Sequence, residues 1–206
     1  MRALLLVDIQ NDFLPGGALA VPEGDQVVHV ANALMSRFDL VLATKDWHPQ
    51  DHCSFAASHA GRRVGETIEH NGLQQILWPV HCVHDTDGAA FPKSLHAREI
   101  DHVILKGLDR DIDSYSGFFD NGRRQATGLA DFLASSNVDR LFVMGLATDY
   151  CVKFTAMDAR ALGFDTTLVR DGCRGVELAD GDVAHAITEM KLAGVHVTSS
   201  DAVPFE

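Results

Sequence analysis

The sequence predicts an α/β fold in which six mainly parallel strands form the middle layer of a three-layer αβα sandwich. Short apolar runs rich in β-branched residues alternate with longer stretches of helical period, which is typical of a Rossmann-like parallel sheet with crossover helices. The chain has 206 residues and is 46% hydrophobic, enough for a full core. No internal repeat or composition shift divides it, so residues 1–206 are predicted to form a single domain.

Six runs are predicted to be strands because each is short and apolar: residues 3–7, 40–44, 103–106, 141–145, 166–169 and 195–198. Four segments place apolar residues at helical spacing, namely 25–38, 129–133, 151–162 and 183–192. The stretch from about residue 45 to 100 has neither pattern and is rich in His, Gly and Pro. Loops of this length in compact domains are usually functional or disordered. We expect this one to be an ordered loop region that carries metal and substrate groups.

Charge and composition exclude several classes of partner. With 17 basic and 29 acidic side chains the formal charge is −12, which repels nucleic-acid phosphates and anionic lipid headgroups. The longest apolar stretches, 3–7 and 141–147, are far shorter than the roughly 20 residues of a membrane-spanning helix. No signal-peptide pattern precedes Asp8. We therefore expect a cytoplasmic protein without nucleic-acid or membrane partners.

Polar residues that end predicted strands are the first functional candidates, because ligands of doubly wound sheets bind beyond the carboxyl ends of the strands. Asp8 follows the first strand and Lys106 ends the third, so the two side chains can pair. Such a pair can also be purely structural. Cys151 begins the helical segment after the strand 141–145, where the helix N-terminus favours a thiolate. In isolation it can equally be a small buried apolar side chain.

Taken together, these three residues form a nucleophile, a base and a cation. Cys151 would attack, Asp8 would take its proton, and Lys106 would hold the carboxylate and favour the thiolate. Backbone amides near Ala147 and Cys151 can form an oxyanion hole. This set predicts acyl transfer from a small amide through a thioester that water then hydrolyses.

A second group of residues has the spacing of a metal site. Asp46 and His48 both point one way if the end of the second strand is extended, and His81 follows a proline turn. One carboxylate and two imidazoles with positions left for water describe a divalent metal site that can also accept substrate. His52 is either a further ligand or a neighbouring hydrogen-bond donor.

Three aromatic residues near these motifs suit a flat apolar ring as substrate, although each can equally be ordinary packing. They are Phe13, Trp78 and Tyr115.

Six motifs carry a resemblance that runs nearly end to end: VDIQNDF (7–13), KDWHP (45–49), WPVHCV (78–83), KG (106–107), DSYSGF (113–118) and GLATDYCV (145–152). In these motifs the chain resembles the nicotinamidases of the isochorismatase-like cysteine hydrolase superfamily. The Asp, Lys and Cys motifs are common to that superfamily. The Asp-Trp-His-Pro and Trp-Pro-x-His motifs are more particular to its metal-containing nicotinamidases.

The resemblance implies hydrolysis of nicotinamide to nicotinate and ammonia in NAD salvage, with pyrazinamide as a further substrate. It implies Asp8, Lys106 and Cys151 as the catalytic triad. It also implies one divalent metal ion, with zinc expected first and iron or manganese as alternatives, held by Asp46, His48 and His81. His52 ligates the metal in some members and lies nearby in others.

The resemblance also assigns the groups around the substrate ring. Phe13 and Trp78 match positions that sandwich the ring. The peptide between Leu146 and Ala147 matches a cis bond that helps to aim the oxyanion-hole amides of Ala147 and Cys151.

Other interpretations remain open at this point. The same triad serves related hydrolases of other small amides or N-carbamoyl compounds, and metal content distinguishes those. A non-enzymatic member that scaffolds partners is a second alternative, which a Cys151 thioester adduct would exclude. The third alternative is a hydrolase that uses the metal to activate water, with Cys151 as a bystander. Chelation would then abolish the reaction, whereas thiol alkylation would leave it running if the pocket stayed open. The sequence does not decide between a monomer and a homo-oligomer.

Overall fold

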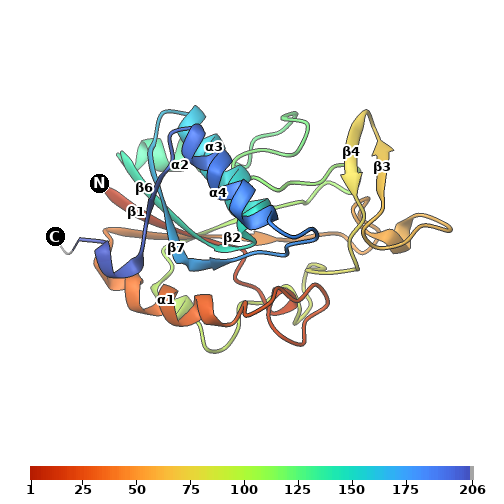
Figure 1. Ribbon diagram of the computed structural model, residues 1–206, viewed down its shortest axis with the longest axis horizontal. Coiled ribbons are helices and arrows are strands. Elements are labelled where there is room, and N and C mark those ends of the chain that lie inside the picture. The colour runs from red at the N-terminus through yellow and green to blue at the C-terminus, as the bar shows by residue number, and fades with distance from the viewer. Residues whose placement is uncertain (205–206) are drawn as a thin grey trace.

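A six-stranded parallel sheet forms the centre of the computed structural model, which describes residues 1–204; the last two residues of the predicted domain lie outside them (Figure 1). The strand order is β5-β2-β1-β6-β7-β8, and every pairing in this sheet is parallel. The bounds are β1 (Arg2–Val7), β2 (Leu40–Asp46), β5 (His102–Lys106), β6 (Arg140–Leu146), β7 (Asp165–Arg174) and β8 (His196–Thr198). The predicted six-stranded sheet is confirmed.

Burial on both faces explains why the central strands are continuous apolar runs. In β1, residues 3–7 are fully buried, because both faces of a parallel sheet are covered by helices. Leu5 on β1 lies beside Leu42 on β2 and Val143 on β6, all of them fully buried. The core therefore lies on both faces of β1, and the polar residues that follow each strand gather at one edge.

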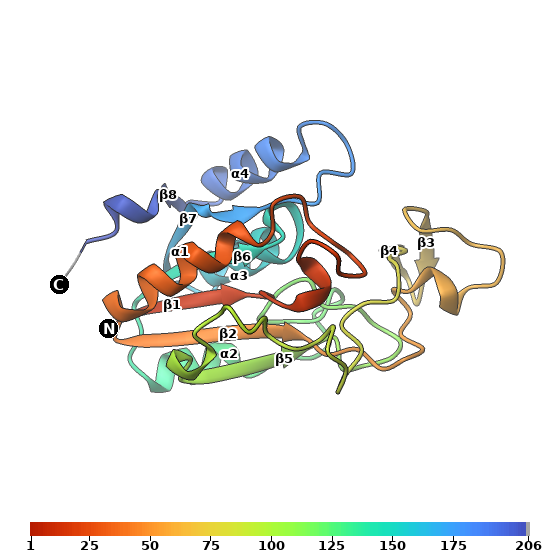
Figure 2. The same ribbon diagram turned by 90° about the horizontal axis from the view of Figure 1, so that it is seen from below.

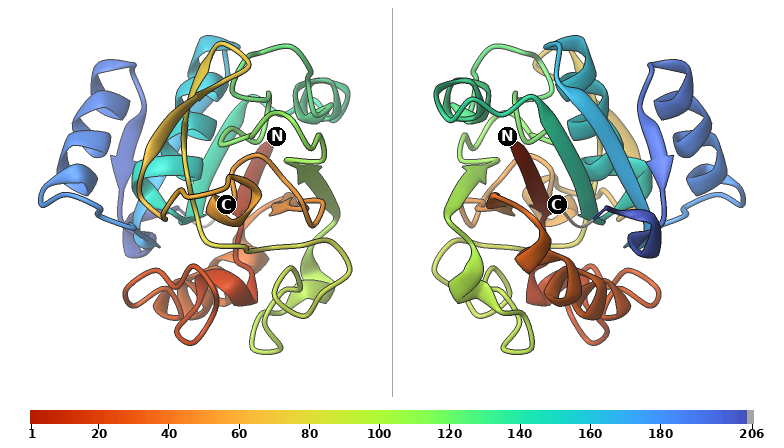
Figure 3. Two further views of the ribbon diagram at one scale, coloured as in Figure 1. Left: turned by 90° about the vertical axis from the view of Figure 1, so that its right-hand side faces the viewer. Right: turned by 90° about the vertical axis from the view of Figure 1, so that its left-hand side faces the viewer.

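Helices cover the two faces and complete the three predicted layers. Helix α1 lies on one face, while α2, α3 and α4 lie on the other (Figures 1 and 3). Their bounds are α1 (Gln26–Leu34), α2 (Leu129–Ser135), α3 (Lys153–Ala161) and α4 (Asp182–Leu192). The four predicted helices are confirmed, and Met35–Arg37 continues α1 as a short 3-10 turn. Among residues 1–204, no helix combines the length and apolarity needed to cross a bilayer.

The expectation that residues 45–100 contain only loop is wrong for one part, a two-stranded antiparallel hairpin. Strands β3 (Thr67–His70) and β4 (Leu73–Ile76) project from the end of the molecule where the sheet strands terminate (Figures 1 and 2). The turn residues Asn71 and Gly72 have φ of 51° and 81°, as a two-residue hairpin turn requires. Asn-Gly was the available sequence signal. The flanking strands are mostly polar and gave no apolar alternation.

Candidate active site

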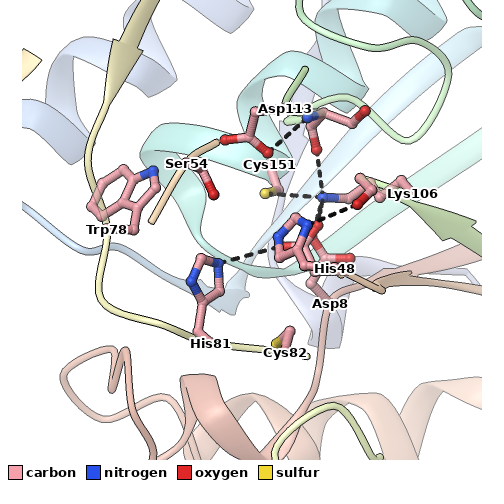
Figure 4. Close-up of polar contacts among 12 residues, drawn as sticks. Asp8, His48, Ser54, Trp78, His81, Cys82, Lys106, Asp113 and Cys151 are labelled. Atoms are coloured by element: carbon pink, nitrogen blue, oxygen red, sulfur yellow. Dashed lines mark hydrogen bonds and ion pairs between the residues drawn. The ribbon is translucent and has the colours of Figure 1, made fainter. Parts of the chain in front are cut away.

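Three buried side chains meet where β1, β5 and β6 end. The Lys106 Nζ lies 2.9 Å from Asp8 Oδ2 and 3.4 Å from Cys151 Sγ (Figure 4). Asp8 is 0% exposed, Lys106 1% and Cys151 7%. The structure therefore brings together the nucleophile, base and cation that the sequence predicted.

The strands fix the positions of Asp8 and Lys106. Asp8 directly follows β1 with a left-handed φ of 49°, and its Oδ1 accepts a 2.6 Å hydrogen bond from Thr44 Oγ1 on β2. Lys106 is the last residue of β5 and lies opposite Asp46 in the parallel register. Because these strands are neighbours or next neighbours in the sheet, their final side chains share one small buried space.

Cys151 precedes the α-helix by two residues, whereas the sequence pattern predicted it at the start of that helix. It belongs to a π-helical turn, Thr148–Val152, and the α-helix begins only at Lys153. The preceding Leu146–Ala147 peptide is cis, as the resemblance implied. The turn places the thiol at the end of β6, facing Lys106.

Burial and the nearby cation act in opposite directions on the pKa of the Cys151 thiol. Burial raises the pKa of the Cys151 thiol well above its usual value of 9.0, and the Asp8 and Asp46 carboxylates raise it further, against Lys106. Loss of hydration therefore opposes the thiolate, which the nearby cation favours. Burial also raises the pKa of Asp8, which places a proton acceptor of increased basicity beside the thiol.

Asp46 joins this triad to the predicted metal site. We call the three predicted ligands, Asp46, His48 and His81, the metal cluster. Its Oδ1 lies 2.5 Å from Lys106 Nζ, and its Oδ2 lies 3.7 Å from His48 Nε2 and 3.9 Å from His81 Nε2. Burial alone would raise the pKa of Asp46, but Lys106 and then His48 outweigh it and hold that pKa far below its usual value. Asp46 therefore stays ionised between the two groups.

The two histidines are oriented as metal ligands need to be. His48 Nδ1 donates to the Gly107 carbonyl at 2.9 Å, and His81 Nδ1 donates to the Pro79 carbonyl at 2.8 Å. Each Nε2 therefore faces Asp46, in the arrangement by which a second hydrogen bond fixes a ligating imidazole. A side chain at Gly107, whose φ is 66°, would overlap the His48 ring. Three ligand atoms within 4.8 Å of one another fit a divalent metal ion.

His52 lies beside this cluster. Its ring stacks on that of His48 with centroids 4.1 Å apart. Its Nδ1 lies 2.7 Å from Ser54 Oγ, and its Nε2 lies 3.3 Å from the Ile112 carbonyl oxygen. Both ring nitrogens are thus occupied by protein partners.

A small pocket of about 30 Å³ lies between the triad and the metal cluster. It is lined by Phe13, Leu19, Asp46, Trp78, His81, Asp113, Tyr115, Ala147, Tyr150, Cys151 and Val176. The three predicted aromatic residues all contribute, and Trp78 Nε1 donates to the Tyr115 hydroxyl at 3.2 Å. A wider groove of about 850 Å³ at the ends of β7 and β8 is lined by none of the triad or cluster residues.

Known proteins share this architecture. An Isochorismatase domain model matches residues 2–202. The nicotinamidase of Escherichia coli is 53% identical over 197 residues, covering 94% of this chain and 92% of that protein. The chain belongs to the isochorismatase family.

Solved structures agree with this assignment to the isochorismatase family. The Acinetobacter baumanii nicotinamidase and pyrazinamidase has a TM-score of 0.95 at 40% identity, covering 98% of both chains. The Pyrococcus horikoshii pyrazinamidase in complex with zinc has a TM-score of 0.76 at 36% identity, covering 96% of this chain and 98% of that one.

Some site residues of this isochorismatase-family protein were missed from the sequence. Asp113 is 4% exposed in the pocket wall, where its Oδ2 accepts a 3.1 Å hydrogen bond from Gln75 Nε2. Gln10 is fully buried and binds both the amide and the carbonyl of Asp46 at 2.8 Å. Gln10 lies inside the motif VDIQNDF (7–13) and Asp113 inside DSYSGF (113–118), and membership of these motifs was the available sequence signal. Leu19, Tyr150 and Val176 enter the pocket through packing that the sequence does not reveal.

Proposed function

We propose that this protein is a nicotinamidase, a hydrolase that cleaves the carboxamide C–N bond of nicotinamide to give nicotinate and ammonia. The observation that carries the proposal is an aromatic-lined pocket with a buried Cys–Asp–Lys set on one side and a three-ligand metal cluster on the other. The 53% identity to the Escherichia coli nicotinamidase supports the same substrate.

We propose zinc as the divalent ion, held by Asp46, His48 and His81. The donor set of one carboxylate and two imidazoles suits zinc, and the Pyrococcus horikoshii relative was solved with it. When bound there, the ion would supply a Lewis acid beside the substrate ring. His52, with both nitrogens hydrogen-bonded to protein atoms, acts in this proposal as a neighbour that packs on His48.

The aromatic residues hold the ring with its carboxamide toward Cys151. Phe13 and Trp78 contact its faces, and Tyr115 holds the Trp78 indole through the hydrogen bond between them. Such packing excludes water and fixes the orientation of the reacting carbon.

In the first half-reaction Asp8 takes the Cys151 proton as Sγ bonds to the carboxamide carbon. The amides of Ala147 and Cys151 stabilise the oxyanion. The C–N bond then breaks, the proton on Asp8 passes to the departing nitrogen, and ammonia leaves a thioester on Cys151. Lys106 keeps Asp8 ionised at the start of each cycle through their 2.9 Å ion pair.

In the second half-reaction water attacks the thioester carbon while Asp8 accepts a proton from it. The C–S bond breaks, the proton returns to Cys151, and nicotinate is released. The sum is one water consumed for each amide cleaved. We further propose that residues 1–206 work as one domain, that pyrazinamide is hydrolysed by the same steps, and that the activity serves NAD salvage.

The substrate is tested by ammonia release from the metal-loaded protein with nicotinamide, pyrazinamide and an N-carbamoyl amino acid. We expect kcat/KM for nicotinamide to exceed that for the carbamoyl compound by at least about 100-fold, because the pocket is built for a flat ring. A preference for the carbamoyl compound, or no release from nicotinamide, would overturn the proposal.

A further inference from the structure

The carboxylate of Asp12 lies outside the triad and binds the backbone next to a metal-cluster histidine. Asp12 belongs to the short 3-10 turn Asn11–Phe13 that follows β1. Its Oδ2 accepts a 2.7 Å hydrogen bond from the amide of Cys82, the residue directly after His81. This is a charge-assisted bond to a part-buried backbone donor, the stronger class of hydrogen bond.

Cys82 needs such a partner because of its backbone conformation. Its φ is 45°, in the left-handed region that non-glycine residues rarely adopt without support. Its carbonyl accepts a 3.0 Å hydrogen bond from the amide of His48. Residue 82 is therefore held by Asp12 on one side and by His48 on the other. Its neighbour His81, beside it in Figure 4, has its Nε2 3.9 Å from Asp46 Oδ2.

Other backbone segments also pack closely against the Asp12 carboxylate. A side chain at Gly88 would overlap it, and the Gly88 carbonyl accepts the Asp12 amide at 3.0 Å. The second carboxylate oxygen, Oδ1, accepts from the Ala18 amide at 3.3 Å. Three separate segments thus fix one carboxylate against the peptide that follows His81.

We propose that Asp12 is a positioning residue of the metal centre: it holds the left-handed Cys82 peptide and thereby aims His81 at the ion. The inference rests on the proposed metal site. Asp12 does not bind the ion in this account. It acts through His81, as outer groups around metal ligands do when they fix ligand orientation.

The test is metal affinity of the full chain, measured by competition with a chromophoric chelator for zinc, together with the visible spectrum of the cobalt(II) form. For Asp12→Ala we expect zinc affinity to fall by about 10- to 100-fold and the cobalt bands to shift. Asp12→Asn keeps an oxygen acceptor for the Cys82 amide, so it should restore most of the affinity and the wild-type spectrum.

Two further variants separate positioning from general loss of structure. Asp120 is a matched control: it is 6% exposed, and its carboxylate accepts backbone amides of its own loop from Gly122, Arg124 and Gln125. Asp120→Ala should lower Tm and leave zinc affinity within about twofold of wild type, a change below 1 kcal/mol. Gly88→Ala displaces the Asp12 carboxylate without removing it, and decides the question if Asp12→Ala does not fold; it should weaken zinc binding in the same direction.

Wild-type zinc affinity in Asp12→Ala, or in Gly88→Ala if the former is unfolded, would overturn the inference. An equal loss in Asp120→Ala would overturn it too, because the effect would then be general destabilisation. A wild-type protein that binds no divalent metal would overturn both this inference and the proposed metal site. Tight, Asp12-dependent zinc binding without nicotinamide hydrolysis would support the inference and contradict only the proposed function.

Discussion

At the scale of single residues, Lys106 holds one positive charge between two carboxylates in a region closed to solvent. Burial alone would lower the pKa of this lysine, but Asp46 and Asp8 raise it well above the usual value. The ammonium is therefore permanent, and it lies 3.4 Å from the Cys151 sulfur. Even so, burial raises the pKa of Cys151 more than Lys106 lowers it.

This balance predicts how alkylation of Cys151 depends on pH in the substrate-free protein. Iodoacetamide reacts with the thiolate, and a thiol whose pKa lies above 9.0 gains thiolate in proportion to pH. The rate at Cys151 should therefore rise about tenfold for each pH unit between 7 and 9, without a plateau. The measurement follows the Cys151 peptide by mass spectrometry.

An alkylation rate at Cys151 that no longer changes with pH above about 7 would contradict this prediction. That result would mean a resting thiolate, and Asp8 would then not be needed as the base that starts the reaction. Cys53, whose pKa burial raises to about 12, serves as an internal comparison within the same digest.

At the scale of elements, the sequence predicted the sheet well because burial on both faces leaves a simple signature. In β1, residues 3–7 are a continuous apolar run directly followed by Asp8, and β5 ends at Lys106. The carboxyl ends of parallel strands meet at one edge, so these polar residues could be placed together without coordinates. Asp46 could be assigned to the metal, but its second contact with Lys106 could not, since it depends on side-chain rotamers.

Elements that are not buried on both faces were harder to predict. The β3–β4 hairpin has mostly polar strands, and only Asn71-Gly72 marks it. Its contribution to the pocket, a hydrogen bond from Gln75 to Asp113, joins residues 38 apart in sequence. Pairs of this kind depend on tertiary packing, which local patterns do not encode.

The hydrogen bond from Gln75 to Asp113 predicts that the hairpin helps to hold the pocket wall. In Gln75→Leu the Asp113 carboxylate loses one of its donors, and the hairpin loses a tie to the pocket wall. We expect KM for nicotinamide to rise several-fold and the free energy of unfolding to fall by about 1–3 kcal/mol. Steady-state kinetics and urea unfolding measure the two effects.

Gln74, exposed on the same strand, provides the matched control. Gln74→Leu should leave both quantities near wild type, within about 0.5 kcal/mol for stability. If Gln75→Leu behaves like Gln74→Leu, the hydrogen bond to Asp113 does not hold the pocket.

At the scale of the whole molecule, the metal cluster connects parts of the chain that are far apart in sequence. Asp46 ends β2, whereas His81 follows the hairpin, and the cluster also contacts Lys106 at the end of β5. Because the three ligands converge only in the folded chain, a metal ion bound there stabilises the fold.

Removal of the metal should therefore lower Tm. At a free metal concentration about 100 times Kd the stabilisation is about 2.7 kcal/mol. For a chain of this size that corresponds to roughly 5–10 °C. Calorimetry with and without chelator measures it. His81→Ala should lose this sensitivity, whereas His84→Ala, whose side chain is 48% exposed, should retain it. A chelator-sensitive Tm in His81→Ala would place the ion elsewhere.

Ammonia release from nicotinamide by Cys151→Ala shows whether Cys151 performs the amide cleavage. Metal content and Tm are recorded on the same sample, so that loss of the ion or of the fold is recognised. We expect the variant to keep the wild-type metal content and Tm but to lose activity by about 10⁴-fold or more. Activity within about tenfold of wild type, a change of 1.36 kcal/mol in the barrier, would contradict the account and leave Cys151 as a bystander.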